Sequence, residues 1–300
     1  MKVVVAGGTG FLGRHISRAL LDAGHQVTVL GRNPDRVSSI ALLQGANATR
    51  GDVTDAATLT GTLEGADAVV QAVQFPNYPM EVARKGLTFD NYDRGGTENV
   101  LAEAQRAGVA KLVYMSGASA DPASEKTWYR AKGLAERAIR ASGIDHAILR
   151  PSWAYGPEDK ALNRFASIAR LSPVVPKPGV KPQRIQPIYV GDVATSVARV
   201  FERNAWNQTI ELGSREVMTM DEVIQTMLDV MRKKRPIVPV PSTLMKIATA
   251  PLSLLPAPPM TPGGVEFATQ DGLVDITKMV EVLGVEPLTL RAGLERYLRA

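Results

Sequence analysis

Short apolar runs alternate with longer segments of helical periodicity through the first half of the chain. Six of these runs have the length of buried strands, and they span residues 2–7, 26–31, 47–51, 67–72, 111–116 and 145–151. Helical patterns follow at about 11–23, 55–64, 86–108 and 126–142. This alternation is typical of a parallel sheet with helices on both faces, so the pattern predicts a doubly wound α/β fold.

The second half of the chain is less regular, and it predicts a smaller C-terminal lobe. We expect a first domain over residues 1–155 and a smaller substrate or partner lobe over residues 156–300. Residues 188–203 have the pattern of a strand end followed by a helix. We therefore expect about 186–203 to return to the first domain.

Two segments of the second half are candidates for interaction surfaces. A helix over 218–236 begins with the capping-box spacing of Thr219 and Glu222, and its last turn holds the basic cluster Arg232 to Arg235. We favour a role for these charges at the negative end of the helix dipole over a basic patch that faces a membrane. Residues 237–264 are apolar, nearly uncharged and rich in proline. We expect them to pack across the second lobe, and the alternative is an exposed surface for a partner or a bilayer.

Composition excludes several kinds of site. The 300 residues include no cysteine, which rules out disulfides, thiolate metal ligands and cysteine nucleophiles. The three histidines are scattered, so no metal site is expected. The net charge of +5 suits a phosphate-bearing cofactor or an anionic membrane surface, and we find no nucleic-acid motif. No run reaches the ~20 apolar residues of a transmembrane helix. We expect a cytoplasmic protein, with peripheral membrane attachment as the alternative.

A glycine-rich loop follows the first strand directly. The stretch VVVAGGTGFLGRHI places Gly7, Gly10 and Gly13 between that strand and the first helix. Gly7 permits the tight turn, Gly10 lets the backbone approach a pyrophosphate, and Gly13 lets the helix lie close to the strand. The helix N-terminus then faces the phosphates, which predicts a Rossmann dinucleotide site. The residues expected to contact the cofactor here are Gly7, Thr9, Gly10, Phe11, Leu12 and Gly13.

The end of the second strand decides between NAD(H) and NADP(H). An acid there would hold the adenosine ribose and repel a 2′-phosphate, but Gly31 occupies the position and Arg32 and Arg36 follow. A guanidinium pairs with phosphate through two parallel hydrogen bonds, so the sequence predicts NADP(H). The alternative is that both arginines are solvated surface residues. The other residues expected to border the cofactor are Asp52, Val53 and Ala72.

These segments resemble a known family. In order, GGTGFLG, GDVTD, GGTENVL, YMSGASA and LRPSWAYGP resemble the motifs of the extended short-chain dehydrogenases/reductases. In the second half, QPIYVGDVA and LGSREVMTMDEV are similar to the atypical branch that contains the NADPH-binding accessory subunit of respiratory complex I and its bacterial relatives. The resemblance covers nearly the whole chain.

The resemblance implies catalytic groups that this chain lacks in part. In active members a Tyr transfers the proton, a Lys four residues later binds the nicotinamide ribose and lowers the pKa of the Tyr, and a Ser or Thr polarises the substrate oxygen. Lys132 is present, but Trp128 stands at the Tyr position and Gly117 at the Ser position. Asp93 replaces an Asn that is frequent in the family. An indole does not titrate near neutrality and glycine has no side chain, so two of the three groups are missing.

Three hydroxyl side chains are candidates to replace the missing acid. Tyr155 follows the sixth strand, and Ser116 and Ser119 follow the fifth. Ligands of open α/β sheets bind beyond the carboxyl ends of the strands, which is where these residues fall. A hydrogen-bonding role in a loop is the simpler explanation for each of them. The candidate catalytic residues are therefore Lys132, Tyr155 and Ser116.

Two functions follow from this pattern. The first is a short-chain dehydrogenase/reductase-like protein that binds NADP(H) with weak or absent turnover and serves as an assembly, stability or redox-sensing factor for a membrane-associated partner. The second is an active NADPH-dependent reductase or epimerase for a small carbonyl, quinone or sugar nucleotide, with a relocated proton donor. Loss of a positioned acid typically costs ~10²–10⁴-fold in rate, so turnover separates the two hypotheses.

Overall fold

The computed structural model describes residues 1–256, 258 and 260–298, and its larger lobe is built on a parallel sheet. The strands are β1 (Lys2–Ala6), β2 (Gln26–Gly31), β3 (Asn47–Arg50), β4 (Ala68–Gln71), β5 (Lys111–Met115), β6 (Asp145–Pro151) and β11 (Gln208–Leu212). Their spatial order is β11-β6-β5-β4-β1-β2-β3. The six predicted strands are present to within one residue at each end, which confirms the doubly wound α/β fold.

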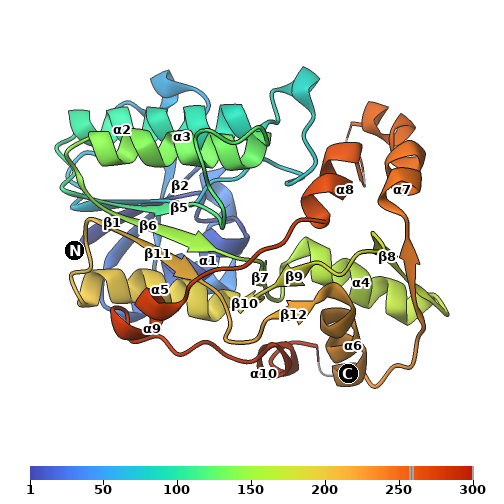
Figure 1. Cartoon of the computed structure of the whole chain (residues 1–300). Helices are drawn as coiled ribbons and strands as arrows, with labels where there is room; N and C mark the ends of the chain where they lie inside the picture. Colours follow the sequence, from blue (N-terminus) through green and yellow to red (C-terminus); the bar gives the residue numbers. More distant parts are fainter. Residues whose placement is uncertain (257, 259, 299–300) are drawn as a thin grey trace.

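Helices cover both faces of this sheet (Figure 1). One face is covered by α1 (Phe11–Asp22), α5 (Val190–Glu202) and α9 (Thr277–Glu281), and the other by α2 (Gly96–Arg106) and α3 (Thr127–Ala141). Each helix turns an apolar stripe inward, such as Ile16 and Leu20 of α1, which are fully buried. Helices cover the sheet on both faces, and both faces are accordingly apolar.

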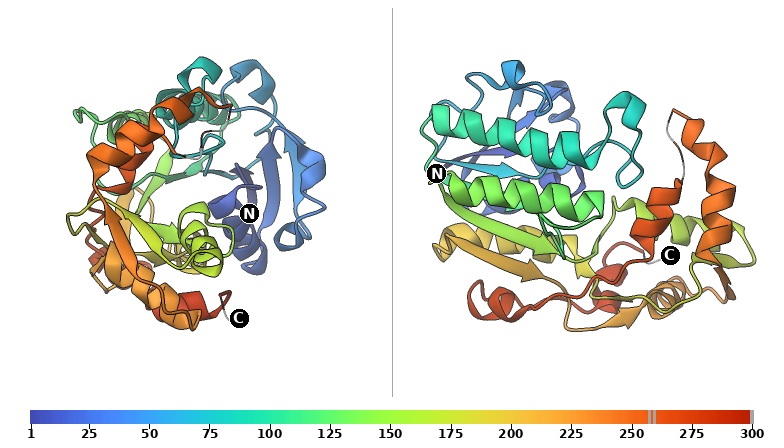
Figure 2. Two further views of the ribbon diagram at one scale, coloured as in Figure 1. Left: turned by 90° about the vertical axis from the view of Figure 1, so that its right-hand side faces the viewer. Right: turned by 45° about the horizontal axis from the view of Figure 1, so that its top comes forward.

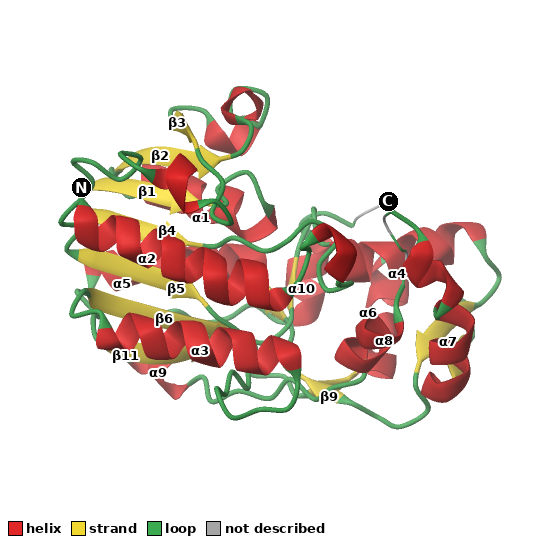
Figure 3. Ribbon diagram, turned by 90° about the horizontal axis from the view of Figure 1, so that it is seen from above, coloured by secondary structure: helices red, strands yellow, loops and turns green. Residues whose placement is uncertain are grey.

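The second lobe lies beyond the carboxyl ends of the sheet strands (Figure 3). Its helices are α4 (Lys160–Leu171), α6 (Met220–Val230), α7 (Ser242–Thr249), α8 (Pro262–Ala268) and α10 (Leu290–Glu295). Its short strand pairs are β7 (Ala154–Tyr155) with β10 (Ile188–Tyr189), β8 (Val175–Pro178) with β13 (Ile237–Val240), and β9 (Arg184–Ile185) with β12 (Met218–Thr219). Figure 2 shows the two lobes from further directions.

The capping box of α6 is present as expected. The Thr219 hydroxyl accepts from the Glu222 amide at 3.3 Å, and the Glu222 carboxylate accepts from the Thr219 amide at 2.7 Å. The helix ends at Val230, however, so the cluster Arg232 to Arg235 follows the last turn and does not lie within it.

The chain returns to the larger lobe after residue 155. Residues 188–203 form β10 and α5, and α5 packs along α1. Strand β11 then adds to the sheet beside β6, and α9 packs against β11. The apolar core between the sheet and α1 therefore includes Met279 and Leu283 from the far end of the chain.

Two predicted helices differ from the structure. The segment 55–64 forms only a 3-10 turn, η3 (Ala56–Leu59), because the chain leaves the helical conformation at Thr60, where ψ is 122°, and Gly61 follows with a φ of 81°. The segment 86–108 begins with a π turn, η5 (Asp90–Gly95), before α2. Such π turns are frequent at functional sites, and this one carries Asp93.

Candidate functional site

The glycine-rich loop has the geometry of a phosphate cradle. Gly7 takes a φ of 79°, and a Cβ built on Gly13 would lie 2.2 Å from the carbonyl oxygen of Gly7. No side chain larger than glycine fits at position 13 without moving the loop. Helix α1 begins at Phe11 with Gly10 as a cap that lacks a side chain. The first amide groups of α1 therefore stay available for a pyrophosphate.

Beside Arg32, which is expected to bind the 2′-phosphate, lies one arginine that the sequence did not indicate. Gly31 pairs in register with Arg50, the last residue of β3. Arg32 Nη1 lies 3.5 Å from the Tyr92 hydroxyl, and Arg50 Nε donates to the Arg32 carbonyl at 3.4 Å. Arg36 lies in the exposed turn η1 (Pro34–Arg36). Pairing of β2 with β3 brings Arg50 beside Arg32, and that pairing is the signal that would have found it.

The residues expected to border the cofactor lie at the same edge of the sheet. The Ala72 carbonyl oxygen is 3.0 Å from the position of a Cβ on Gly7, since the ends of β1 and β4 are neighbours. Asp52 Oδ1 accepts from the Thr54 amide at 3.0 Å and orders the loop after β3. Val53 is buried, and its neighbour in the structure is Gly96, where a Cβ would clash with it at 2.8 Å.

Helix α3 brings Lys132 against Gly117 and Asp93. Lys132 is buried, and a Cβ on Gly117 would lie 3.3 Å from its Cδ atom. The ammonium donates to the Met115 carbonyl at 3.3 Å and lies 2.8 Å from Asp93 Oδ1. Burial raises the pKa of Asp93, and the Lys132 charge opposes that rise. Three positions that the family resemblance singled out are therefore adjacent.

Trp128 is part of an aromatic cluster that joins the two lobes. Its ring centroid lies 6.2 Å from Phe89, 5.5 Å from Tyr129 and 5.4 Å from Phe267 of α8. The side chain is buried, and its Nε1 has no hydrogen-bond partner within residues 1–256, 258 and 260–298. Sequence reasoning missed Phe89 and Phe267, because no local motif marks two rings that are far apart in the chain.

The structure corrects the candidate Tyr155. It lies in β7 and is fully buried in the core of the second lobe. Its hydroxyl donates to the carbonyl oxygens of Thr289 and Leu290 at 3.4 Å, and a Cβ on Gly293 would collide with it at 2.0 Å. Burial, above all, raises the pKa of Tyr155. Tyr155 therefore packs against α10 within the core of the second lobe.

The structure also corrects the candidate Ser116. Its hydroxyl donates to Glu136 Oε1 at 2.6 Å, and Arg150 and Arg140 donate to the same carboxylate at 2.7 Å. Burial would raise the pKa of Glu136, but the hydrogen bonds from Arg150 and Ser116 hold it below its ordinary value. Ser116 thus supports a buried ion-pair network. Ser119 is exposed and takes a φ of 60°.

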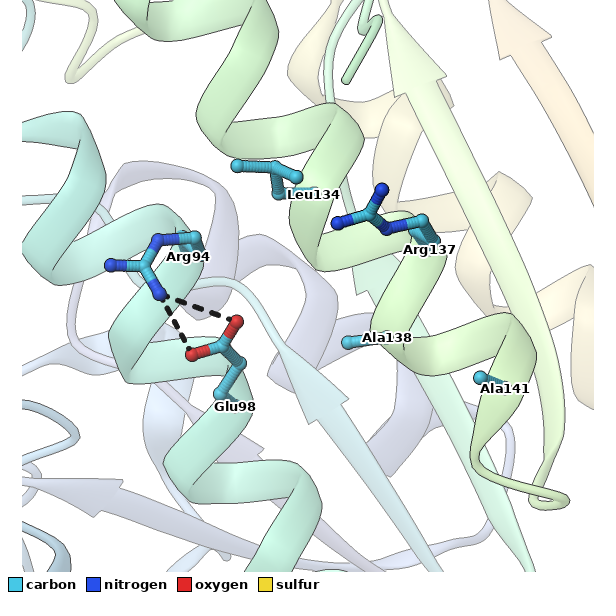
Figure 4. Close-up of a pocket in the computed structure, with 6 residues that line it drawn as sticks. All are labelled: Arg94, Glu98, Leu134, Arg137, Ala138 and Ala141. Carbon is cyan, nitrogen blue, oxygen red and sulfur yellow. Dashed lines mark hydrogen bonds and ion pairs between the residues drawn. The ribbon is translucent and has the colours of Figure 1, made fainter. Parts of the chain in front are cut away.

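A groove of about 490 Å³ lies between α2 and α3, away from the carboxyl ends of the strands (Figure 4). Arg94 and Glu98 form an ion pair at 3.1 Å on one side of it. The α3 side consists of Leu134, Arg137, Ala138 and Ala141. None of these residues was predicted to bind the cofactor, and the groove does not contain Lys132.

Comparison with known proteins identifies the family. A profile described as NAD(P)H-binding matches residues 7–170. The chain belongs to this NAD(P)H-binding family. The match covers the glycine-rich loop, both arginines and Lys132, and it confirms the predicted nicotinamide dinucleotide as the cofactor class.

The named relatives of this family member include subunits of respiratory complexes and enzymes. The mitochondrial NADH dehydrogenase (ubiquinone) 1 alpha subcomplex subunit 9 of Arabidopsis thaliana is 26% identical over 82% of the chain. The chain spans 62% of that relative's length. A 3 beta-hydroxysteroid dehydrogenase/Delta 5-->4-isomerase of Mycobacterium tuberculosis is 27% identical over 96% of the chain and 86% of the relative. The resemblance to the complex I subunit and its relatives is thereby confirmed.

A solved structure supports the fold. The NADPH-dependent quinone oxidoreductase of Escherichia coli, in complex with NADPH, superimposes with a TM-score of 0.75 at 20% identity. The alignment covers 98% of this chain and 99% of that one. The alignment therefore includes the smaller lobe in addition to the sheet.

Proposed function

We propose that this protein binds NADP(H) and transfers hydride weakly or not at all, and that it serves as an accessory factor for a membrane-associated partner. The observation that supports the first part most directly is the burial of Trp128 at the position of the family's acid. Its indole packs against Phe267 and has no ionisable group to exchange a proton.

No predicted hydroxyl takes the place of that acid. Tyr155 is buried in the core of the second lobe, and the Ser116 hydroxyl donates a hydrogen bond to Glu136. The charge of Asp93 acts on two phenols, Tyr78 and Tyr114, and the pKa of each is raised by burial first and by Asp93 second. A raised pKa makes a phenol a poorer proton donor at neutral pH.

Cofactor binding can matter without turnover. Lys132 and the glycine-rich loop are both retained, so the dinucleotide still has an ammonium for its ribose and free amides for its phosphates. A ligand present at a hundred times its dissociation constant stabilises the folded state by ~2.7 kcal/mol. Occupancy by NADP(H) would therefore act as a stability signal that responds to the cofactor pool.

An apolar surface on the second lobe supports the partner. Leu244 and Ile247 of α7 are 58% and 67% exposed, and Leu254 of the following turn η6 (Pro251–Leu254) is 74% exposed. Exposed apolar side chains that gather in this way mark interaction surfaces. Segment 237–264 was expected to pack across the lobe, but this part of it turns outward. None of the described helices is long and apolar enough to cross a bilayer.

The experiment combines a binding and a kinetic measurement on the purified protein. We expect calorimetry to give a tight NADPH complex, while single-turnover mixing with small quinones, aldehydes and ketones leaves the 340 nm absorbance unchanged over minutes. Oxidation of bound NADPH within seconds would contradict the proposal. In a co-purification or liposome-flotation assay, Leu244→Ser together with Ile247→Ser should reduce the bound fraction. Leu171→Ser, at an even more exposed apolar site on α4, should not.

An active dehydrogenase is the second candidate. The relative from Mycobacterium tuberculosis, which is named as a steroid dehydrogenase/isomerase, matches 96% of the chain, and this full-length match favours it. In that case water would have to supply the proton, because the predicted surrogates are buried elsewhere. Steroid oxidation or reduction that survives in Trp128→Phe would support it.

A further inference from the structure

Asp93 and Tyr92 are buried in the π turn η5, while Asp90 and Arg94 of the same turn lie nearer the surface. The side chain of Asp93 is 1% exposed, and Lys132 is its only ion-pair partner among the described residues. Asp90 and Arg94 of the same turn pair with each other at 2.6 Å near the surface. The turn thus separates an exposed carboxylate from a buried one three residues away.

In the family, the positive charge of the lysine at position 132 would lower the pKa of the acid at position 128. An uncompensated positive charge within ~4–6 Å favours the ionised form of an acid and lowers its pKa by ~1–3 units. Here the ammonium has a carboxylate oxygen 2.8 Å away. At this distance a carboxylate charge offsets the ammonium charge, so the two together exert little net field on their surroundings. Position 128, one helical turn before Lys132, therefore faces a neutral pair.

We infer that Asp93 is a third substitution that removes acid chemistry from this site, because it neutralises Lys132 and would leave a phenol at position 128 unactivated. This inference rests on the proposed lack of turnover and deepens it: Asp93 acts on position 128 through Lys132, as a positioning residue. Restoring Tyr at 128 alone would then leave the site inactive.

The surroundings of the pair agree with this electrostatic balance. The titratable groups on which the Asp93 charge acts are Tyr78 from the segment after β4 and Tyr114 from β5. Two groups of α3 lie next to these phenols, since Tyr129 acts on Tyr78 and Glu136 acts on Tyr114. The Asp93 charge contributes to raising the pKa of both Tyr78 and Tyr114, after burial. Lys132 Nζ lies 5.6 Å from the centre of the Tyr114 ring.

The test measures the ionisation of a phenol introduced at position 128. Trp128→Tyr is prepared alone and with Asp93→Asn, each with tyrosine labelled at the ¹³Cζ atom, and the new resonance is followed by NMR from pH 7 to 12. We expect the phenol of the single variant to titrate at or above the usual value of ~10. Adding Asp93→Asn should lower the midpoint by one pH unit or more, because Lys132 is then uncompensated.

Asp90→Asn is the matched control, since it removes the exposed carboxylate of the same π turn. It should leave the midpoint within about 0.3 units of the single variant, because a surface charge is screened by solvent. A midpoint well below 10 with Asp93 present, or no decrease on adding Asp93→Asn, would overturn the inference. If Asp93→Asn does not fold, Asp93→Ser, which leaves room for water beside Lys132, takes its place.

The titration is independent of the proposed function. Turnover by the unmodified protein would contradict the lack of activity and leave the phenol measurement intact, since no substrate is present in it. Conversely, a phenol that titrates low beside Asp93 would refute the role of Asp93 while Trp128 still accounts for an inactive site.

Discussion

The ring of Trp128 and the ring of Phe267 meet edge to face, with centroids 5.4 Å apart and planes inclined at 74°. This contact joins α3 of the larger lobe to α8 of the smaller lobe at the position where active relatives carry their acid. Aromatic pairs of this geometry contribute ~0.5–1.5 kcal/mol beyond the area they bury. Trp128 therefore contributes to holding the two lobes together.

Phe267→Ala should lower the free energy of unfolding by about 2–3 kcal/mol, somewhat less than a fully buried Phe, because Phe267 is only partly buried. Urea denaturation followed by circular dichroism measures the change. Leu273→Ala, at an apolar side chain that is 37% exposed, is the control and should cost less than about 0.5 kcal/mol. Equal losses in the two variants would show that the Trp128 contact adds nothing.

Gly13→Ala should abolish dinucleotide binding, because the added Cβ would lie 2.2 Å from the Gly7 carbonyl oxygen and displace the phosphate cradle. Calorimetric titration with NADPH is the measurement. Gly263→Ala, in α8, has no neighbouring atom within 4 Å and should bind normally with unchanged or slightly higher stability. Normal affinity in Gly13→Ala would mean that the cofactor does not use this loop.

Arg32→Gln and Arg50→Gln should each weaken the binding of NADPH by roughly 10–100-fold and leave the affinity for NADH nearly unchanged. The reason is that a charge-assisted hydrogen bond to the 2′-phosphate contributes ~1.5–3 kcal/mol. Dissociation constants for both cofactors give the result. Arg36→Gln, in the exposed turn η1, should have the smaller effect. If the affinities for NADPH and NADH decreased equally in all three variants, the arginines would be surface residues that do not contact the 2′-phosphate.

Asp159 should make stability decrease as the pH rises from about 4 to 6. Burial, opposed by hydrogen bonds from the start of α4, raises its pKa from 3.8 to about 6. Between these values the folded protein binds more protons than the unfolded chain, so the stabilisation present below the unfolded pKa is lost as the pH passes the folded one. The contribution is at most about 3 kcal/mol at ~1.4 kcal/mol per unit.

Asp159→Asn retains a capping side chain and removes this titration. The difference in unfolding free energy between the variant and the unmodified protein should therefore grow in favour of Asn across that pH interval. Measurements at pH 4, 5, 6 and 7 are sufficient. A difference that does not change with pH would place Asp159 in a better solvated environment than the structure indicates.

Most of the sheet could be predicted from sequence because β1, β2, β4, β5 and β6 are short and largely apolar runs. Strand β11 was missed, since QTIEL alternates polar and apolar residues and follows two asparagines with positive φ, Asn204 and Asn207. It is an edge strand with partners on one side only, so its composition carries a weaker signal. Tyr155 was misplaced for a related reason: the chain leaves the sheet at Pro151, and the two-residue strand β7 already belongs to the smaller lobe.

The missing acid could be recognised from local sequence, because the family places it four residues before Lys132. The residues that surround this position could not be predicted from local sequence. Asp93 and Phe267 meet α3 only through the tertiary fold, and the inward direction of Asp93 depends on a π turn that helical periodicity does not reveal. Arg50 likewise becomes a cofactor candidate only when β3 is paired with β2.

The closing stretch of the chain belongs to both halves, since Met279 and Leu283 lie in one core and Leu290 and Leu294 in the other. A fragment that stops at residue 155 would lose β11 and leave one edge of β6 unpaired, which invites association with other chains. Proteolytic removal of the last thirty or so residues would likewise loosen both halves at once. Heating should accordingly melt the intact protein in a single cooperative transition, without a surviving nucleotide-binding piece.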